Sequence, residues 1–195
     1  MIKIKIKIIL GSTRSNRFSD KVGQWIYEET KRKEDIEAEI LDLRDYPLPF
    51  FDEPVSPAAI QNGDYPNETA RRWASKIREA DAFIIVTPEY NHGIPGVLKN
   101  ALDYIYYEWN NKPVGFISYG SVGGARVIEQ LRQIAIELQM APIRNSIHIL
   151  NHWNLLEENG NLKKGALDSF KRNADAFLAQ LIWWAKALKS ARKHL

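Results

Sequence analysis

The chain has no cysteine among its 195 residues, which excludes disulfide bonds, thiolate metal sites and a cysteine nucleophile. Its formal net charge is only +3, and no basic stripe with interleaved aromatic residues indicates a nucleic-acid partner. No apolar run approaches the roughly 20 residues that span a bilayer. The N-terminal alternation of lysine and isoleucine also differs from a signal peptide. We therefore expect a soluble, cytoplasmic protein with neither a membrane nor a nucleic-acid partner.

The remaining composition is that of an ordinary globular protein, with 45% hydrophobic and 26% charged residues. A chain of this length can form one domain with a well-buried core. No internal repeat, low-complexity segment or linker divides it. We therefore expect a single domain over residues 1–195.

Apolar patterning predicts five strands, each followed by a helix. The expected strands cover residues 2–10, 36–43, 82–86, 114–117 and 146–150. The expected helices cover residues 18–31, 67–80, 97–107, 126–139 and 167–188. Parallel strands need crossover connections of one hand, so this alternation predicts an α/β fold. It should be a doubly wound, five-stranded parallel sheet with helices on both faces.

The first strand carries Lys3, Lys5 and Lys7 in alternation with isoleucine. A central parallel strand is normally apolar on both faces. We therefore expect these lysines at the solvent end of the sheet, with only residues 8–10 fully buried.

Helix ends and one helix face give further expectations. Ser19 and Asn67 are placed as N-caps of the first and second helices. Trp183 and Trp184 fall in the C-terminal helix, whose apolar face we expect to pack on the sheet rather than lie on a membrane.

Three loops that follow strands contain specialised residues, at 11–19, 87–96 and 118–124. In an open α/β sheet, ligands bind beyond the carboxyl ends of the strands. All three loops should lie at that edge, which favours a site for a planar, phosphorylated cofactor.

The first loop combines hydroxyl side chains with Arg14 and Arg17, directly before a helix. Backbone N–H groups of a first helical turn have no helical partner, and the helix dipole favours an anion there. The loop lacks both the G-x-G-x-x-G pattern and a Walker G-K-[ST], which favours a terminal phosphate monoester over a dinucleotide. An ordinary capped helix with solvated arginines is an equal alternative for this loop alone.

The other two loops are compatible with a flat heterocycle. Glu89, Tyr90 and Asn91 offer backbone amides, an aromatic ring and an amide side chain. Gly123 and Gly124 allow the backbone to approach a ligand closely or to adopt a positive φ. Taken singly, each loop is equally well explained as an ordinary turn.

Together these loops resemble the NADPH-dependent FMN reductase family, which has a flavodoxin-like fold with strand order 2-1-3-4-5. The matching segments are GSTR at 11–14, TPEYNHGIPGVLKNALD at 87–103 and GSVGGAR at 120–126. Many relatives have serine three residues beyond the arginine of the first motif, where this chain has Arg17. That arginine either binds the phosphate or points to solvent.

The resemblance implies a cofactor-binding set drawn from all three loops. It consists of Ser12, Arg14, Arg17, Phe18, Ser19, Pro88, Glu89, Tyr90, Asn91, Ser118, Tyr119, Gly120, Gly123 and Gly124. The first five would bind the FMN phosphate, and the others would line the ribityl chain and the ring. Arg126 is left out, because it would serve either a nucleotide phosphate or a salt bridge within its own helix.

The implied activity is that of an FMN-dependent NAD(P)H oxidoreductase, with NADPH or NADH as electron donor. Hydride would pass through bound FMN to a quinone, a flavin, an azo compound or a similar small acceptor. This chemistry belongs to the cofactor and requires no catalytic side chain. The alternatives are a flavodoxin-like electron carrier, which Arg14 and the sequence pI of about 9.0 disfavour, and a non-redox member of the fold.

Family members commonly form dimers, so we expect a homodimer or homotetramer. The candidate interface is an aromatic cluster formed by Tyr104, Tyr106, Tyr107 and Trp109. His148 and His152 lack a third ligand at a suitable spacing, so we expect no metal site.

Overall fold

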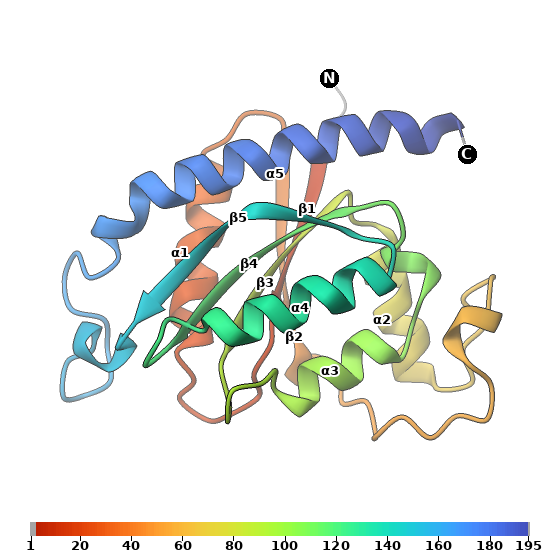
Figure 1. Ribbon diagram of the computed structural model, residues 1–195, viewed down its shortest axis with the longest axis horizontal. Helices are drawn as coiled ribbons and strands as arrows, with labels where there is room; N and C mark the ends of the chain where they lie inside the picture. Colours follow the sequence, from red (N-terminus) through yellow and green to blue (C-terminus); the bar gives the residue numbers. More distant parts are fainter. Residues whose placement is uncertain (1–2, 195) are drawn as a thin grey trace.

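The computed structural model describes residues 3–194 and contains a five-stranded parallel sheet (Figure 1). Its strands are β1 (Ile4–Leu10), β2 (Ile36–Asp42), β3 (Ala82–Pro88), β4 (Pro113–Gly120) and β5 (Ala141–Leu150). Their spatial order is β2-β1-β3-β4-β5, and every neighbouring pair is parallel. This is the strand order of flavodoxin-like doubly wound sheets. The predicted fold is confirmed.

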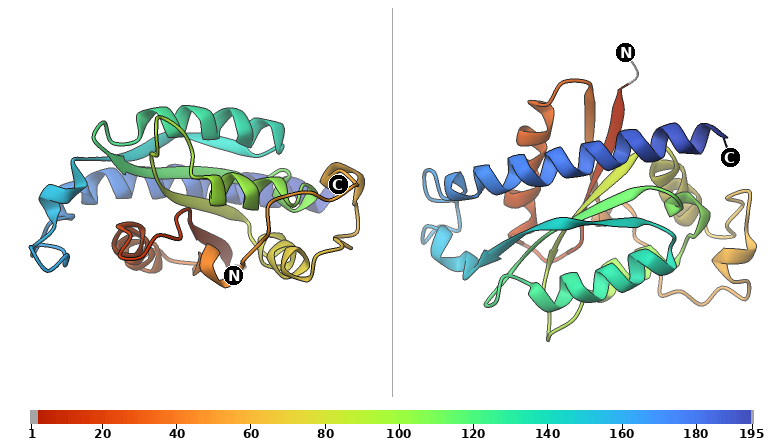
Figure 2. Two further views of the ribbon diagram at one scale, coloured as in Figure 1. Left: turned by 90° about the horizontal axis from the view of Figure 1, so that it is seen from below. Right: turned by 45° about the horizontal axis from the view of Figure 1, so that its top comes forward.

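Helices cover both faces of the sheet. They are α1 (Ser19–Lys31), α2 (Glu68–Arg78), α3 (Gly96–Asp103), α4 (Ala125–Glu137) and α5 (Lys171–Ala191). Helices α1 and α5 share one buried apolar cluster with the sheet, and α2, α3 and α4 share the other. Figure 2 shows α4 and α5 on opposite sides of the strands.

The predicted element boundaries differ from the structure mainly in the second half of the chain. Strand β5 begins at Ala141 rather than at residue 146, and helix α3 ends at Asp103 rather than at residue 107. The predicted start of the first strand, Ile2, lies outside the described residues. The apolar patterns therefore predict which helices and strands exist, but they place some element ends several residues away from the ends in the structure.

The expectation that the lysines of the first strand lie at a solvent end is wrong for Lys7. Its side chain is only 3% exposed, and Ile4 and Ile6 are buried as well. The Lys7 ammonium forms ion pairs with Glu39 on β2 and with Glu79 just after α2, the second at 2.7 Å. Two carboxylates from neighbouring elements therefore compensate the charge at this position.

The predicted N-cap of α2 is confirmed, since the Asn67 side chain accepts a hydrogen bond from the backbone N–H of Ala70 at 3.1 Å. The apolar face of the C-terminal helix packs on the sheet as expected, but Trp183 and Trp184 lie outside that face, at 64% and 36% exposure. The inward stripe of α5 instead consists of Ala174, Phe177, Leu178, Leu181 and Ala185. That spacing occupies one face of the helix and leaves the two indoles outside it.

No helix within residues 3–194 combines the length and the apolar character that crossing a bilayer requires.

The aromatic cluster proposed as an interface is largely part of the core. Tyr104 and Trp109 are 1% and 0% exposed. The Trp109 ring packs against Phe83 and Trp73, with centroid distances of 4.9 and 5.9 Å. These two residues therefore cannot contribute to a subunit interface, and that part of the prediction is wrong.

Candidate functional site

The three loops meet at the carboxyl edge of the sheet, as predicted. Strands β1, β3 and β4 are adjacent, and Pro88 lies beside Tyr119 in the β-register. Ser12 Oγ and Tyr90 Oη are 2.9 Å apart, which joins the first loop to the second. The backbone N–H of Glu89 donates to the Tyr119 carbonyl at 3.3 Å, which joins the second loop to the end of β4. The loops therefore form one continuous surface.

The first loop contains a row of backbone donors. No atom of residues 3–194 accepts a hydrogen bond from the backbone N–H groups of residues 15–18. Asn16 has a φ of 52°, which bends the chain sharply before α1 begins at Ser19. Arg14 is exposed, and its guanidinium carbon lies 5.8 Å from the centroid of the Tyr90 ring. Open N–H donors, a helix N-terminus and a cation together suit a phosphate group.

Arg17 lies in the same turn, but its side chain is buried and bonds to other protein groups. Its Nε donates to Asp20 at 2.7 Å, and Nη1 donates to Asp42 at 2.9 Å. Nη1 also donates to the Ser12 carbonyl, and Nη2 bonds to both carboxylates. The guanidinium thus makes four hydrogen bonds to the protein and a further ion-pair contact with Asp20. The alternative that Arg17 points to solvent is therefore wrong, because its guanidinium is engaged by protein groups.

The partner carboxylate Asp42 remains ionised at ordinary pH. Burial by itself raises the pKa of Asp42, but hydrogen bonds from Arg17 and Arg44 outweigh burial and lower that pKa to about 2. The ion pair between Arg17 and Asp42 therefore persists throughout the physiological range.

Phe18 and Ser19, at the end of the turn, pack against side chains from β4 and from the segment after β5. Ser19 Oγ and Tyr119 Oη are 2.6 Å apart, and the Phe18 ring lies 5.1 Å from Tyr119 and 4.8 Å from His152. Ser19 is fully buried and makes no capping hydrogen bond, so the prediction that it is the N-cap of α1 is wrong. Its hydroxyl bonds with Tyr119 instead. Sequence reasoning also missed His152, because no local motif signals contact with residues that are more than thirty positions away.

The second loop forms a tight turn. Tyr90 and Gly93 exchange backbone hydrogen bonds of 3.0 and 2.9 Å. Asn91 and His92 at the tip have φ values of 49° and 67°, as a two-residue turn of type I′ requires. Asn91 is exposed, whereas Pro88 is buried at the end of β3. The turn therefore presents the Asn91 amide at the sheet edge.

Glu89 connects the second loop to helix α4. Its carboxylate accepts a hydrogen bond from Arg126 Nη1 at 2.5 Å and another from the Arg126 backbone N–H at 3.1 Å. Arg126, in the first turn of α4, therefore forms its salt bridge with the second loop, rather than within its own helix as one alternative expected. Arg126 is the last residue of the GSVGGAR motif, which was the sequence signal available for it.

The third loop packs tightly against β4. Ser118 Oγ donates to the Thr87 carbonyl at 2.8 Å. Gly123 and Gly124 have φ values of 67° and 70°, and a Cβ on Gly124 would lie 1.8 Å from Ser118 Oγ. Glycine is therefore required at position 124 by both conformation and space. Gly120, at the end of β4, is half-buried.

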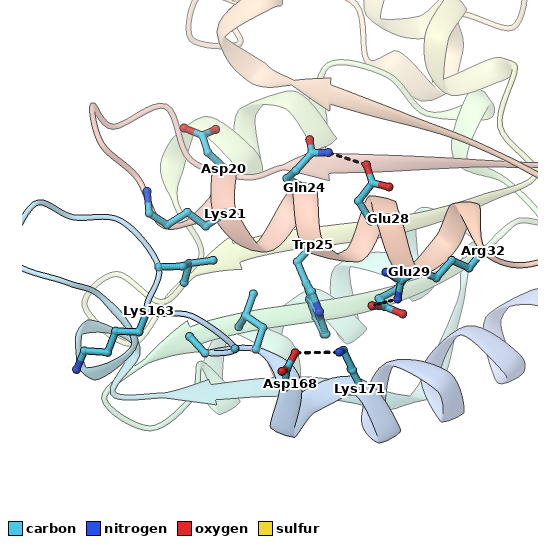
Figure 3. Close-up of a pocket in the computed structure, with 14 residues that line it drawn as sticks. Asp20, Lys21, Gln24, Trp25, Glu28, Glu29, Arg32, Lys163, Asp168 and Lys171 are labelled. Carbon is cyan, nitrogen blue, oxygen red and sulfur yellow. Dashed lines mark hydrogen bonds and ion pairs between the residues drawn. The ribbon is translucent and has the colours of Figure 1, made fainter.

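A separate groove of about 680 Å³ lies between α1 and the segment of residues 162–171 (Figure 3). Trp25 points from α1 toward the Asp168–Lys171 ion pair on the other side of the groove. None of the predicted site residues is among the described residues that line this groove. It is therefore distinct from the three-loop surface.

Comparison with known proteins identifies the group to which this fold and these loops belong. A model of the NADPH-dependent FMN reductase family matches residues 4–154. The chain belongs to this family. The matched region contains all three loops, so the chain is an FMN-dependent NAD(P)H oxidoreductase, and the reductase hypothesis prevails over the electron-carrier alternative.

Two curated family relatives and one solved structure illustrate the similarity. The NAD(P)H-dependent FMN reductase of Schizosaccharomyces pombe is 44% identical over 141 residues, which cover 71% of this chain and 70% of the relative. The quinone reductase of Escherichia coli is 34% identical over 142 residues, with coverage of 70% and 71%. The flavoenzyme NAD(P)H:(acceptor) oxidoreductase FerB of Paracoccus denitrificans superposes with a TM-score of 0.69 at 22% identity, over 91% of this chain and 97% of FerB. The last comparison supports the fold alone.

Proposed function

We propose that the three loops hold FMN, with its phosphate in the turn of residues 12–19. The observation that carries this assignment is the row of backbone N–H groups of residues 15–18, which make no hydrogen bond within the described chain. Arg14 stands exposed beside them and supplies a full positive charge. Charge-assisted hydrogen bonds to such donors are the strong interactions of a phosphate monoester.

The isoalloxazine ring then lies between the second and third loops. Tyr90 and Asn91 offer their side chains, and the residues from Ser118 to Gly120 line the opposite side. Gly123 and Gly124 have positive φ values, and His148 and Ser118 occupy the space where their Cβ atoms would lie, so these glycines give the third loop its tight path along this edge. The donor set and the shape of this edge thus fit the cofactor.

Bound FMN supplies the hydride chemistry of this family. The residues of the chain bind and orient the cofactor and leave one side of the site open to small molecules. Burial raises the pKa of Tyr119 to about 12, although its hydrogen bond with Ser19 acts in the opposite direction. Tyr119 therefore stays protonated and supports the site, and no side chain is assigned a catalytic proton transfer.

The electron acceptor is a quinone, a flavin, an azo compound or a similar small molecule. The quinone is favoured by the similarity to the quinone reductase of Escherichia coli. We also propose a homodimer or homotetramer, because Phe50, Trp153 and Trp183 are large apolar side chains more than half exposed on one chain. We further propose a cytoplasmic location, where the enzyme would have access to NAD(P)H. Light scattering at micromolar concentration tests the assembly, since a monomeric mass would contradict it.

The visible absorption spectrum tests the site and the activity together. The purified protein should show flavin bands, either directly or after addition of FMN, and anaerobic NADPH should bleach them. Bands that persist with both NADPH and NADH would contradict the reductase activity. A protein that binds no FMN at all would overturn the assignment of the three loops.

A further inference from the structure

Arg17 and Asp42 form the best-defined ion pair at the sheet edge. The two guanidinium nitrogens Nη1 and Nη2 face the two oxygens of Asp42, a paired geometry that only arginine provides. Asp42 is the last residue of β2 and lies beside Leu10, the last residue of β1, in the β-register. The pair therefore ties the turn after β1 to the neighbouring strand.

The same guanidinium also holds one peptide group of the turn. Nη1 of Arg17 donates to the carbonyl oxygen of Ser12. In a planar trans peptide, the carbonyl and the following N–H point in opposite directions. With the Ser12 carbonyl held by Arg17, the N–H of Thr13 is directed away from Arg17, and no atom of residues 3–194 accepts a hydrogen bond from it.

We propose that Arg17 and Asp42 act as a clamp that orients the phosphate turn, so that Arg17 promotes FMN binding without touching the phosphate. The proposal rests on the proposed function, because it concerns the same turn. A carbonyl oxygen that rotated toward a phosphate would repel it, and the clamp prevents that rotation. Arg17 and Asp42 are thus positioning residues.

The charges around the turn are consistent with Arg14 as the phosphate ligand and Arg17 as a positioning residue. The positive charge of Arg17 is matched by Asp20 and Asp42, and Arg44 bonds to the same two carboxylates. These four side chains sum to zero charge. Arg14 makes no ion pair within residues 3–194 and is the cation left to meet a phosphate.

Riboflavin lacks the phosphate, so comparing its affinity with that of FMN isolates the contribution of the turn. Both flavins are titrated into the flavin-free full-length chain and followed by quenching of flavin fluorescence. Wild-type protein must first prefer FMN over riboflavin, and absence of flavin binding there would instead refute the proposed function. Asp42→Asn and Arg17→Gln should each weaken FMN binding about tenfold or more while leaving riboflavin affinity unchanged.

The double variant, Arg17→Gln with Asp42→Asn, separates a clamp from a direct phosphate contact. If the two residues act as one unit, its FMN affinity should match that of the single variants, because their effects are not additive. The double variant also leaves no unpaired charge at Asp42 or Arg17, so it should fold even where a single variant does not. Arg44→Gln is the matched control, since Arg44 bonds to Asp42 but not to the turn, and it should bind FMN as wild type does.

Three outcomes would overturn the clamp. FMN affinity could be unchanged in all the variants. Arg17→Gln could weaken FMN binding while Asp42→Asn does not, which is the signature of a direct contact between Arg17 and the phosphate. Riboflavin affinity could fall by the same factor as FMN affinity, which would indicate a general loss of structure.

Discussion

The hydroxyl oxygens of Tyr119 and Ser19 lie 2.6 Å apart, which links the carboxyl end of β4 to the first turn of α1. Both side chains are buried, at 4% and 0% exposure. A buried hydroxyl that loses its partner bears an uncompensated desolvation cost. This single hydrogen bond therefore stabilises the contact between β4 and the start of α1, directly after the phosphate turn.

Tyr119→Phe should lower the free energy of unfolding by about 1–3 kcal/mol, because it leaves the Ser19 hydroxyl buried without a partner. Urea unfolding of the variant and the wild type measures the loss. Adding Ser19→Ala should recover part of it, since removing both partners is less costly than removing one. Tyr27→Phe is the control, because no residue described in the structure bonds to the Tyr27 hydroxyl. Equal stability of Tyr119→Phe and wild type would show that the hydrogen bond contributes nothing.

Arg14→Ala should weaken FMN binding by about 1.5–3 kcal/mol, the range for hydrogen bonds to charged groups. Riboflavin affinity should stay the same, because the lost contact is with the phosphate. Fluorescence titration with both flavins measures the effect, and the exposed Arg144→Ala provides a control of equal charge change. If FMN affinity is unaffected, the phosphate is bound elsewhere.

Gly124→Ala should destabilise the protein and weaken flavin binding. The substitution forces an alanine to a φ of 70° and brings its Cβ within 1.8 Å of Ser118 Oγ. Gly160→Ala is a matched control, because Gly160 has a φ of 79° but no atom lies within 4 Å of the position that a Cβ would occupy there. In the control, the free energy of unfolding should fall only by the cost of placing alanine at a positive φ, about 1–3 kcal/mol. Thermal unfolding should rank Gly124→Ala as the less stable variant, and the reverse order would refute the steric argument.

Lys112 should make stability increase as pH rises above neutrality. Burial lowers the pKa of Lys112 to about 7, and the Arg192 charge adds to this effect. Between about pH 7 and the ordinary lysine pKa of 10.5, the unfolded chain binds a proton that the folded chain does not. Stability therefore rises with pH across this window.

Urea unfolding at several pH values from about 7 to about 9.5, within that window, measures this slope. Lys112→Met should flatten it, although the variant also removes hydrogen bonds to the Ile77 and Arg78 carbonyls and so lowers stability overall. The exposed Lys171→Met should keep the wild-type slope. An unchanged slope in Lys112→Met would show that Lys112 is charged in the folded protein.

The roles of individual side chains at the site could be predicted only in part. The GSTR motif includes Arg14 but not Arg17, and so favours Arg14 as the phosphate ligand. In the structure Arg14 is exposed and Arg17 is buried. The burial of Arg17 depends on Asp42, which is 25 positions away. Likewise, Ser19 meets Tyr119 at a separation of 100 positions, which no local pattern reports.

The sequence by itself determined the five strands, the alternating helices and the three loops at one sheet edge. Such features follow from local periodicity and from the rule that parallel strands end on the same side. Only the tertiary structure decided which charges are compensated, such as Lys7 by two glutamates and Arg17 by two aspartates. Ion pairs and buried hydrogen bonds depend on distances of a few ångströms between segments far apart in the chain. Those distances exist only after the sheet and its helices have packed.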